Sequence, residues 1–216
     1  MYKDFKRIGE LLFREGLVDS HGGNMSVRQG DKIFITKKDT MLGDLKEGDI
    51  VEVGMEPGEN DREASRELIS HRSIYKQTKA QAIIHAHSAN AIAISITDNK
   101  IIPQDAEGLF LYKAASIIRV RNAVGSDEAA RLLPAFLSGE KGVAVVKGHG
   151  SFATGKDLEE AYKLTSSLEN SCKIIVAVRA SGGKPAPRKE RHEPRHLKGG
   201  IPPGLGVMDR SRLRRR

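Results

Sequence analysis

Ile83-Ile84-His85-Ala86-His87-Ser88 is an apolar run that ends in two histidines separated by one small residue. In an extended strand, side chains two positions apart point to the same face, so the rings of His85 and His87 can converge on one ion. Neutral imidazole is a common protein ligand for zinc and its neighbours. The alternative is that two histidines merely stand at the end of a strand, and this stretch alone does not decide between the two interpretations.

Two further stretches carry groups that a metal enzyme uses. Gly148-His149-Gly150 follows a predicted apolar strand over 142–146, and flanking glycines leave the His149 ring accessible. Helical spacing of apolar residues over 61–77 places Glu67 and His71 four apart on one face, near an apolar edge where burial raises the pKa of a carboxyl group. A turn histidine and an exposed helical glutamate are the ordinary alternatives.

Gly22-Gly23-Asn24 follows a predicted first helix over 2–17. Glycine amides can approach an anion closely because no Cβ intervenes, and the Asn24 side chain adds a donor beside them. The pattern therefore predicts an anion-binding turn, with a plain tight turn as the alternative.

The sequence reads as a series of short strands and helices. Short strands in quick succession favour antiparallel pairing. Besides those named above, the predicted strands are 32–36, 49–53, 80–87 and 116–120, and the predicted helices are 89–96, 126–137 and 157–178, the last with Asp157 as its N-cap.

The net charge of +8 lies in the C-terminal tail. From Ser181 to Arg216 there are eleven Lys/Arg and three Asp/Glu, whereas residues 1–180 hold twenty-five of each sign. We expect one catalytic domain over 1–180 and a flexible, basic Pro/Gly-rich tail over 181–216. The tail predicts weak attraction to polyanions such as RNA, and a solvated tail without a dedicated partner is the alternative.

The single cysteine, Cys172, lies among apolar residues of the last predicted helix and cannot form an internal disulfide. A buried, inert thiol is the expectation for it. The sequence holds no apolar run of the roughly 20 residues that a membrane span needs, and its first residues are not typical of a signal peptide. These features predict a soluble, cytoplasmic protein.

Together the motifs resemble the class II aldolase/adducin family, and within it the zinc-dependent fuculose-1-phosphate aldolases. The resemblance covers roughly residues 5–178, and its specificity comes from the order of several separate motifs rather than from any one of them. The motifs are Gly22-Gly23-Asn24-Met25-Ser26-Val27-Arg28, Ile35-Thr36, Ser65-x-Glu67-x-x-x-His71, His85-Ala86-His87 and Gly148-His149-Gly150.

The resemblance implies a three-layer α/β/α sandwich around a largely antiparallel, mixed sheet, assembled as a homotetramer with the active site between subunits. It implies a Zn²⁺ ion, or another divalent transition metal, held by His85, His87 and His149, with an open position for substrate. Glu67 would move a proton while the ion stabilises the enediolate of a phosphorylated ketose, so the implied activity is that of an aldehyde-lyase of carbohydrate metabolism. The substrate phosphate would contact Gly22, Gly23, Asn24 and Ser65.

Several positions depart from the aldolase pattern. Arg66 stands where the aldolase has a second serine, Asp39 where it has a glycine, and His21 where it has a threonine. We expect Arg66 to offer the phosphate a charge-assisted hydrogen bond and Asp39 to repel it unless it turns away. His71 is interpreted either as an orienting group for Glu67 or a phosphate, or as a structural histidine.

The family's active-site tyrosine after its Ile-Pro segment has no counterpart beside Ile102-Pro103, so Asp105, Glu107 or Tyr112 is the candidate for that second acid/base group. A sugar-phosphate dehydratase or epimerase of the same family is the alternative activity, although the family's epimerases carry an aspartate in place of Glu67. A non-catalytic, adducin-like interaction module is the alternative of another class.

Overall fold

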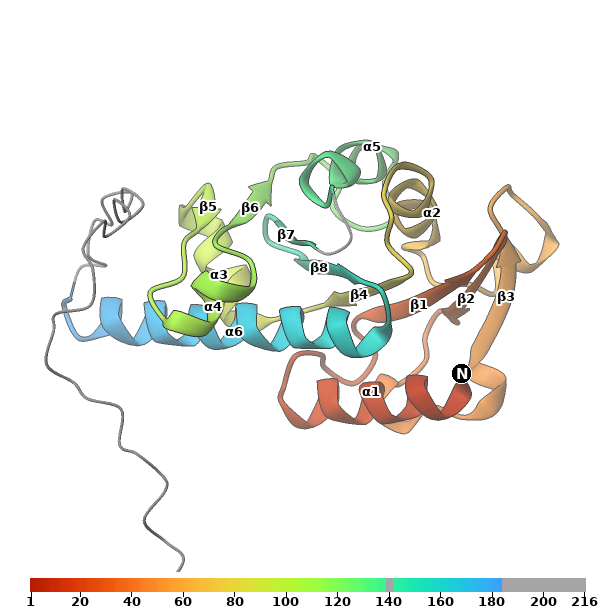
Figure 1. Ribbon diagram of the computed structural model, residues 1–216, viewed down its shortest axis with the longest axis horizontal. Helices are drawn as coiled ribbons and strands as arrows, with labels where there is room; N and C mark the ends of the chain where they lie inside the picture. The colour runs from red at the N-terminus through yellow and green to blue at the C-terminus, as the bar shows by residue number, and fades with distance from the viewer. Residues whose placement is uncertain (139–141, 184–216) are drawn as a thin grey trace, which may run out of the picture. The chain divides into compact units, whose positions relative to one another are not determined.

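A mixed β-sheet forms the middle layer of the computed structural model (Figure 1), which describes residues 1–138 and 142–183. Its eight strands are ordered β3-β2-β1-β4-β8-β7-β6-β5, and all neighbours are antiparallel except β6 and β7. The strands are β1 (Asn24–Gln29), β2 (Lys32–Thr36), β3 (Ile50–Gly54), β4 (Ala82–Ala86), β5 (Lys100–Ile101), β6 (Ala115–Ile118), β7 (Gly142–Val146) and β8 (Gly150–Gly155).

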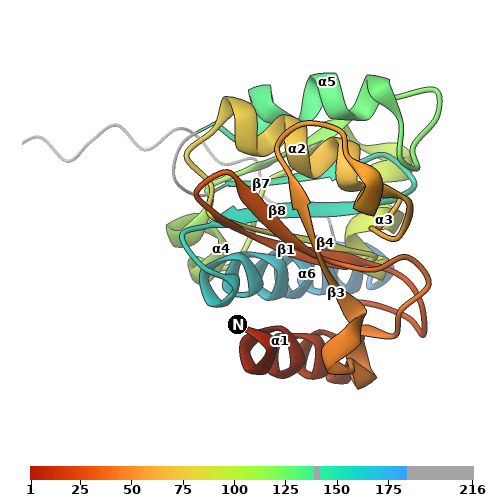
Figure 2. The same ribbon diagram turned by 90° about the vertical axis from the view of Figure 1, so that its right-hand side faces the viewer.

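Helices cover both faces of the sheet (Figure 2). The α-helices are α1 (Tyr2–Arg14), α2 (Leu68–Gln77), α3 (Ala89–Thr97), α4 (Ala106–Leu111), α5 (Asp127–Phe136) and α6 (Leu158–Ala180), and three short 3-10 helices are η1 (Leu42–Asp44), η2 (Glu47–Asp49) and η3 (Glu59–Arg62). α2 and α5 lie on one face, and α1, α3, α4 and α6 lie on the other. This arrangement confirms the predicted three-layer α/β/α fold.

Strand β4 shows how the sequence builds the two cores. Its residues are all buried, and successive side chains point to opposite faces. Ile83 packs in the cluster that includes Leu68 of α2 and Leu133 of α5, whereas Ile84 packs with Leu12 of α1. A strand covered on both faces is mostly apolar, which explains why the residues that lead up to His85 form a continuous apolar run.

Most predicted elements are present, with shifted ends. The strands over 32–36 and 142–146 match β2 and β7, and the Asp157 side chain caps α6 by accepting a hydrogen bond from Glu160 N at 2.8 Å. Strand β8 has no counterpart in the sequence-based prediction, because glycines at both of its ends mask its pattern.

The predicted helix over 61–77 is wrong in its first part, since α2 begins only at Leu68. The residues before it pair with the end of β2 and the chain that follows: Ser65 N donates to Thr36 O at 3.1 Å, and Lys38 N donates to Glu63 O at 3.1 Å. These tertiary hydrogen bonds replace the helical ones. Glu67 therefore stands at the N-cap of α2 rather than within a helix.

All described residues belong to one compact unit. The predicted flexible tail lies, apart from residues 181–183, outside the described residues, so its boundary and its predicted polyanion binding stay predictions. Among the helices of the described residues, none combines the length and the hydropathy that crossing a bilayer requires.

Candidate metal centre and active site

Three histidines come together at one edge of the sheet. His85 is near the end of β4, His87 follows the strand by one residue, and His149 lies in the turn between β7 and β8. One ligand atom from each of them lies within 4.8 Å of the other two. The structure thus assembles the three predicted metal ligands, and the triad is consistent with a divalent metal site.

The neighbouring strand fixes the orientation of His85. Its Nδ1 lies 3.0 Å from the carbonyl oxygen of Ser151 in β8. A carbonyl can only accept, so Nδ1 carries the proton and donates, and Nε2 is left with a free lone pair. A backbone carbonyl that holds one ring nitrogen is the usual partner of a metal-binding histidine.

The spacing of the ring nitrogens fits a single ion. His87 Nε2 lies 3.2 Å from His85 Nε2. Two nitrogens bound to one tetrahedral zinc at its normal bond length are about 3.4 Å apart. Three imidazoles also leave a fourth coordination position open, which is typical of catalytic rather than structural zinc. The donor set therefore fits zinc or a similar divalent ion.

All three histidines are held neutral, which is the form that binds metal. Burial, together with the nearby rings of His149 and His87, lowers the pKa of His85 well below its ordinary value. Burial lowers the pKa of His87 as well. For His149, burial and the proximity of His87 lower the pKa to about 4.

Two glycines make room for the ligand rings. A Cβ on Gly150 would lie 2.9 Å from His85 Cε1 and 2.4 Å from the Ala86 carbonyl oxygen. A Cβ on Gly22 would lie 2.5 Å from His87 Nδ1. Side chains at these positions would displace the ligands, so both glycines are required by close packing against the triad.

Glu67 lies beside the triad, with Oε1 3.9 Å from His149 Nε2. Its carboxylate is 3% exposed and accepts two hydrogen bonds, from Gly125 N to Oε1 at 2.7 Å and from Ser70 Oγ to Oε2 at 2.9 Å. Burial raises the pKa of Glu67 above its ordinary value, and the two hydrogen bonds oppose that shift. A fixed carboxyl group with a raised pKa is suited to proton transfer.

His71 belongs to a separate buried network. Its Nδ1 lies 2.6 Å from Ser26 Oγ, which in turn lies 2.7 Å from Tyr75 Oη. Burial lowers the pKa of His71 to about 3, so the ring is neutral. No hydrogen bond joins its side chain to Glu67 within the part of the chain that the structure describes. The contacts favour the structural interpretation of His71.

The predicted phosphate contacts come from two segments of the chain, one at the start of β1 and one just before α2. Asn24 is paired across the sheet with His85, and its Oδ1 is buried without a hydrogen-bond partner among residues 1–138 and 142–183. Gly22 N already donates to Asp19 Oδ1 at 2.6 Å. Ser65 is buried next to Glu67, and Ser65 Oγ accepts a hydrogen bond from Glu67 N at 3.2 Å. The turn is thus closed by an acid that the sequence patterns did not single out.

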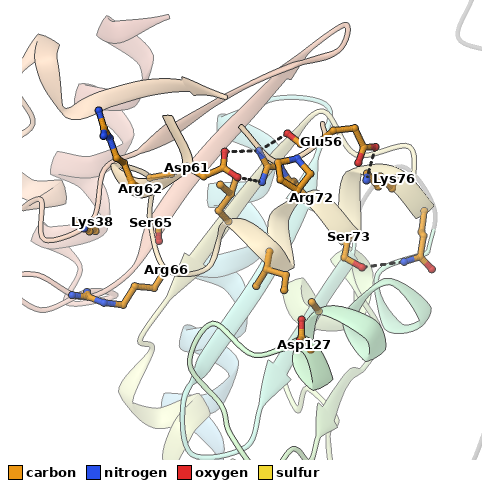
Figure 3. A pocket seen from close by; sticks show the side chains of 16 residues that line it. Lys38, Glu56, Asp61, Arg62, Ser65, Arg66, Arg72, Ser73, Lys76 and Asp127 are labelled. Atoms are coloured by element: carbon orange, nitrogen blue, oxygen red, sulfur yellow. Dashed lines mark hydrogen bonds and ion pairs between the residues drawn. The ribbon is translucent and has the colours of Figure 1, made fainter. Parts of the chain in front are cut away.

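Ser65 also lines a pocket of about 760 Å³ that runs along α2 and includes residues at the start of α5. Figure 3 shows Lys38 and Arg66 at one end of this pocket and Lys76 at the other. The triad does not line the pocket, so the cavity is a neighbour of the metal centre rather than the centre itself.

Arg66 is exposed, but its guanidinium is paired. Its guanidinium binds Asp39, with Nη1–Oδ1 at 2.9 Å and Nη2–Oδ2 at 3.4 Å. Asp39 adopts a positive φ of 61°, a conformation that favours the glycine of the aldolases. The two departures from the aldolase pattern therefore form one ion pair.

The three candidates for a second acid/base group have different surroundings. Asp105 caps α4 by accepting a hydrogen bond from Gly108 N at 2.8 Å. Tyr112 is partly buried at the end of α4, and burial raises the pKa of its hydroxyl. Glu107 is exposed on the same helix. Of the three side chains, only that of Glu107 is exposed.

The family model for the class II aldolase and adducin N-terminal domain matches residues 3–176. The chain belongs to this family. A structure of L-fuculose-1-phosphate aldolase from Thermus thermophilus is 33% identical, with a TM-score of 0.78 over 86% of this chain and 97% of that one. The fold is thus that of the family.

Two sequence relatives differ in their reactions. An L-fuculose phosphate aldolase of Methanocaldococcus jannaschii is 32% identical over 81% of this chain and 94% of its own length. A methylthioribulose-1-phosphate dehydratase of Acidiphilium cryptum is 29% identical over 77% and 85%. The family therefore does not by itself decide which bond is broken.

Sequence reasoning missed the residues that hold the site in place. Ser151 orients His85, and Gly125 and Ser70 fix Glu67. Gly125-Ser126 gave a weak signal as a turn before a helix, whereas Ser151 gave none, because its contact uses only a backbone carbonyl.

Proposed function

We propose that the chain is a metal-dependent lyase that cleaves or forms a carbon–carbon bond in a phosphorylated ketose. The observation that carries the proposal is the placement of the buried Glu67 carboxylate 3.9 Å from a nitrogen of the candidate ligand His149. Proton transfer next to a carbonyl needs an acid/base group and a stabilising charge in one site. Glu67 and the triad are placed to provide both.

When bound, a divalent ion supplies Lewis-acid chemistry that polarises the oxygens of a substrate. Glu67 then holds or accepts the proton at its carboxylate. Gly125 N and Ser70 Oγ fix the direction of that carboxylate, and its raised pKa brings it closer to the pH at which both protonation states are populated. The Ser151 carbonyl holds the proton of His85 on Nδ1, so the lone pair of His85 Nε2 would be free to hold the ion.

The substrate phosphate is assigned to the side of the site formed by Gly22, Gly23, Asn24 and Ser65. Support comes from the place of Ser65 in a pocket that also contains the cationic side chains of Lys38 and Arg66. A phosphate at this end would compete with Asp39 for the Arg66 guanidinium. Phosphate recognition therefore involves an exchange of partners by Arg66.

A homotetramer with the active site between subunits is part of the proposal. Two exposed aromatic side chains support this assembly: Phe110 on α4 is 82% exposed, and Phe136 at the end of α5 is 45% exposed. Both aromatic side chains line a small cavity of about 290 Å³. Exposed aromatic clusters mark protein contacts. Assembly through α4 would present the exposed Glu107 to a second copy, where it serves as the second acid/base group.

The test is a screen of phosphorylated ketoses and of aldehydes with the zinc-loaded chain, followed by product analysis. Aldol cleavage yields two carbonyl fragments whose carbon atoms sum to those of the substrate. The matched control is His149→Ala. If the zinc-loaded wild-type chain turns over no phosphorylated ketose faster than this variant does, the proposal is contradicted.

A sugar-phosphate dehydratase is the second candidate, favoured by the Acidiphilium relative. The same Glu67 and histidines would serve it, since removal of water next to a carbonyl also begins with proton transfer. Its product retains every carbon of the substrate and is lighter by one water. The same product analysis therefore separates the two reactions, and an absence of bound metal would favour a non-catalytic, adducin-like module.

A further inference from the structure

Helix α3 contacts both turns that carry the candidate metal ligands. It begins at Ala89, two residues after His87. Near its other end, Ser95 Oγ accepts a hydrogen bond from Gly148 N at 2.9 Å, and Gly148 directly precedes His149. The position of α3 therefore affects both His87 and His149.

The start of α3 is held by a residue from a distant part of the chain. The first N–H groups of a helix have no partners within the helix, and within the described structure Ser88, the N-cap residue, makes no side-chain cap hydrogen bond. Glu169 of α6 takes that role. Its Oε1 accepts from Asn90 N at 3.1 Å and Asn90 Nδ2 at 2.7 Å, and its Oε2 accepts from Ala91 N at 3.1 Å.

Glu169 is 2% exposed, so its carboxylate has lost nearly all contact with water. Burying a charge without partners is unfavourable, and the three donors of α3 replace the lost hydration. A rotation or shift of α3 relative to α6 would break these bonds. The carboxylate also compensates the partial positive charge at the start of α3, which would otherwise act against a cation bound nearby at His87.

We propose that Glu169 is a positioning residue for the metal centre: it holds α3, and through α3 the turns of His87 and His149, in the geometry that binds one ion. Ser95 transmits this constraint to the His149 turn through its bond with Gly148 N. The inference rests on the proposed metal site and adds to it a group that lies outside the ligands and does not touch the substrate.

The test uses the full chain with Glu169→Gln. Glutamine keeps the size of the side chain but has an NH₂ group in place of one carboxylate oxygen. Because that group donates, the side chain can no longer accept from both Asn90 and Ala91 as the two oxygens of Glu169 do. The matched control is Thr165→Val, one turn earlier on α6, because buried Thr165 donates only to Ala161 O of its own helix, at 2.9 Å, within the described structure. Each variant is titrated with Zn²⁺ against a chromophoric chelator, its visible absorption is recorded with Co²⁺, and its melting temperature is measured without metal.

We expect Glu169→Gln to bind zinc about tenfold more weakly and to show an altered Co²⁺ spectrum, as found when groups that orient metal ligands are changed. Thr165→Val retains the zinc affinity and the spectrum of the wild type, even if its melting temperature falls. Ser95→Ala shifts zinc affinity in the same direction as Glu169→Gln, and it decides the question if Glu169→Gln does not fold.

The inference would be overturned if Glu169→Gln bound zinc with wild-type affinity and showed an unchanged Co²⁺ spectrum. If Glu169→Gln does not fold, the same result for Ser95→Ala would overturn it. Glu169 would then be a residue that only stabilises the fold. A wild-type chain that binds neither ion would instead contradict the proposed function.

Discussion

Glu67 Oε1 lies 3.9 Å from His149 Nε2, and both side chains are at least nine-tenths buried. The two residues are far apart in the sequence and come from two different parts of the fold, the N-cap of α2 and the β7–β8 turn. Their proximity places a carboxyl group of raised pKa against a candidate metal ligand. This arrangement links the metal centre to proton transfer.

Glu67→Gln is expected to keep the metal and lose turnover. The amide oxygen can still accept from Gly125 N, and the amide nitrogen can donate to Ser70 Oγ, so both hydrogen bonds of the wild type have counterparts. Only proton transfer is removed, and kcat should fall by about 10²- to 10⁴-fold. Turnover is measured on the ketose found in the screen, and metal content by elemental analysis.

Glu63→Gln is the control for this variant, because Glu63 precedes the same helix but pairs with Lys37 at the surface. It should keep both metal and kcat. Unchanged kcat in Glu67→Gln would remove Glu67 from the mechanism.

Arg66 and Asp39 should affect substrate binding in opposite directions. Asp39→Asn removes the charge that holds Arg66, and asparagine tolerates the positive φ at this position, so KM for a phosphorylated substrate should fall a few-fold. Arg66→Ala should raise KM by roughly tenfold with kcat unchanged. Steady-state kinetics with the phosphorylated ketose and its unphosphorylated form separate the effect of the phosphate. Equal changes for both forms would contradict the assignment.

Arg72 and Asp61 should make stability depend on pH. The hydrogen bonds of the Arg72 guanidinium hold the pKa of Asp61 below its ordinary value, with Nη2–Oδ1 at 2.7 Å (Figure 3). Because the folded pKa is lowered, the pair stabilises the fold above the unfolded pKa of about 3.9 and loses this effect as the pH falls through the folded pKa. Asp61→Asn should lower the free energy of unfolding by about 1 kcal/mol at pH 7.

Denaturant unfolding at a series of pH values checks this prediction. The difference in the free energy of unfolding between wild type and Asp61→Asn should shrink toward zero as the pH falls below the unfolded pKa. Glu59→Gln, in the same 3-10 helix, is the control and should show a much smaller difference at pH 7. If the free energy of unfolding of Asp61→Asn differs from that of the wild type by the same amount from neutral to acid pH, the ion pair is not the cause of the difference.

Phe110→Asp should reduce self-association. The side chain is 82% exposed, so the substitution costs little in the folded monomer, whereas a charge within a contact between copies is unfavourable. Sedimentation velocity should show the wild type as a tetramer and the variant as smaller species. Val124→Asp, at another exposed apolar residue, is the control. A wild type that sediments as a monomer would contradict the proposed assembly.

The sequence predicted the site better than it predicted what surrounds it. His85 and His87 were recognisable because a period of two residues marks one face of a strand, and His149 because glycines flank it after an apolar strand. Strand β4 was recognisable from its continuous apolar run, whereas the three layers were implied by the resemblance to the family. For the histidines and for β4 the local pattern carries the information.

The supporting contacts could not be predicted, because they join residues far apart in the sequence. Glu169 reaches the start of α3, Ser151 offers a backbone carbonyl to His85, and Gly125 donates to Glu67. A glutamate on an amphipathic helix has the same appearance in sequence whether it is exposed or buried. For the same reason α2 is shorter than the helix predicted over 61–77: the residues before Leu68 pair with the end of β2 and the segment after it, and such pairing has no local signal.

The metal content of the purified chain tests the central claim most directly. Protein prepared without chelators and dialysed after loading with zinc should hold one divalent ion per chain, and His149→Ala prepared in parallel should hold far less. A folded wild-type chain that holds no divalent ion, and takes up none when zinc is offered, would contradict the assignment of His85, His87 and His149 as a metal centre.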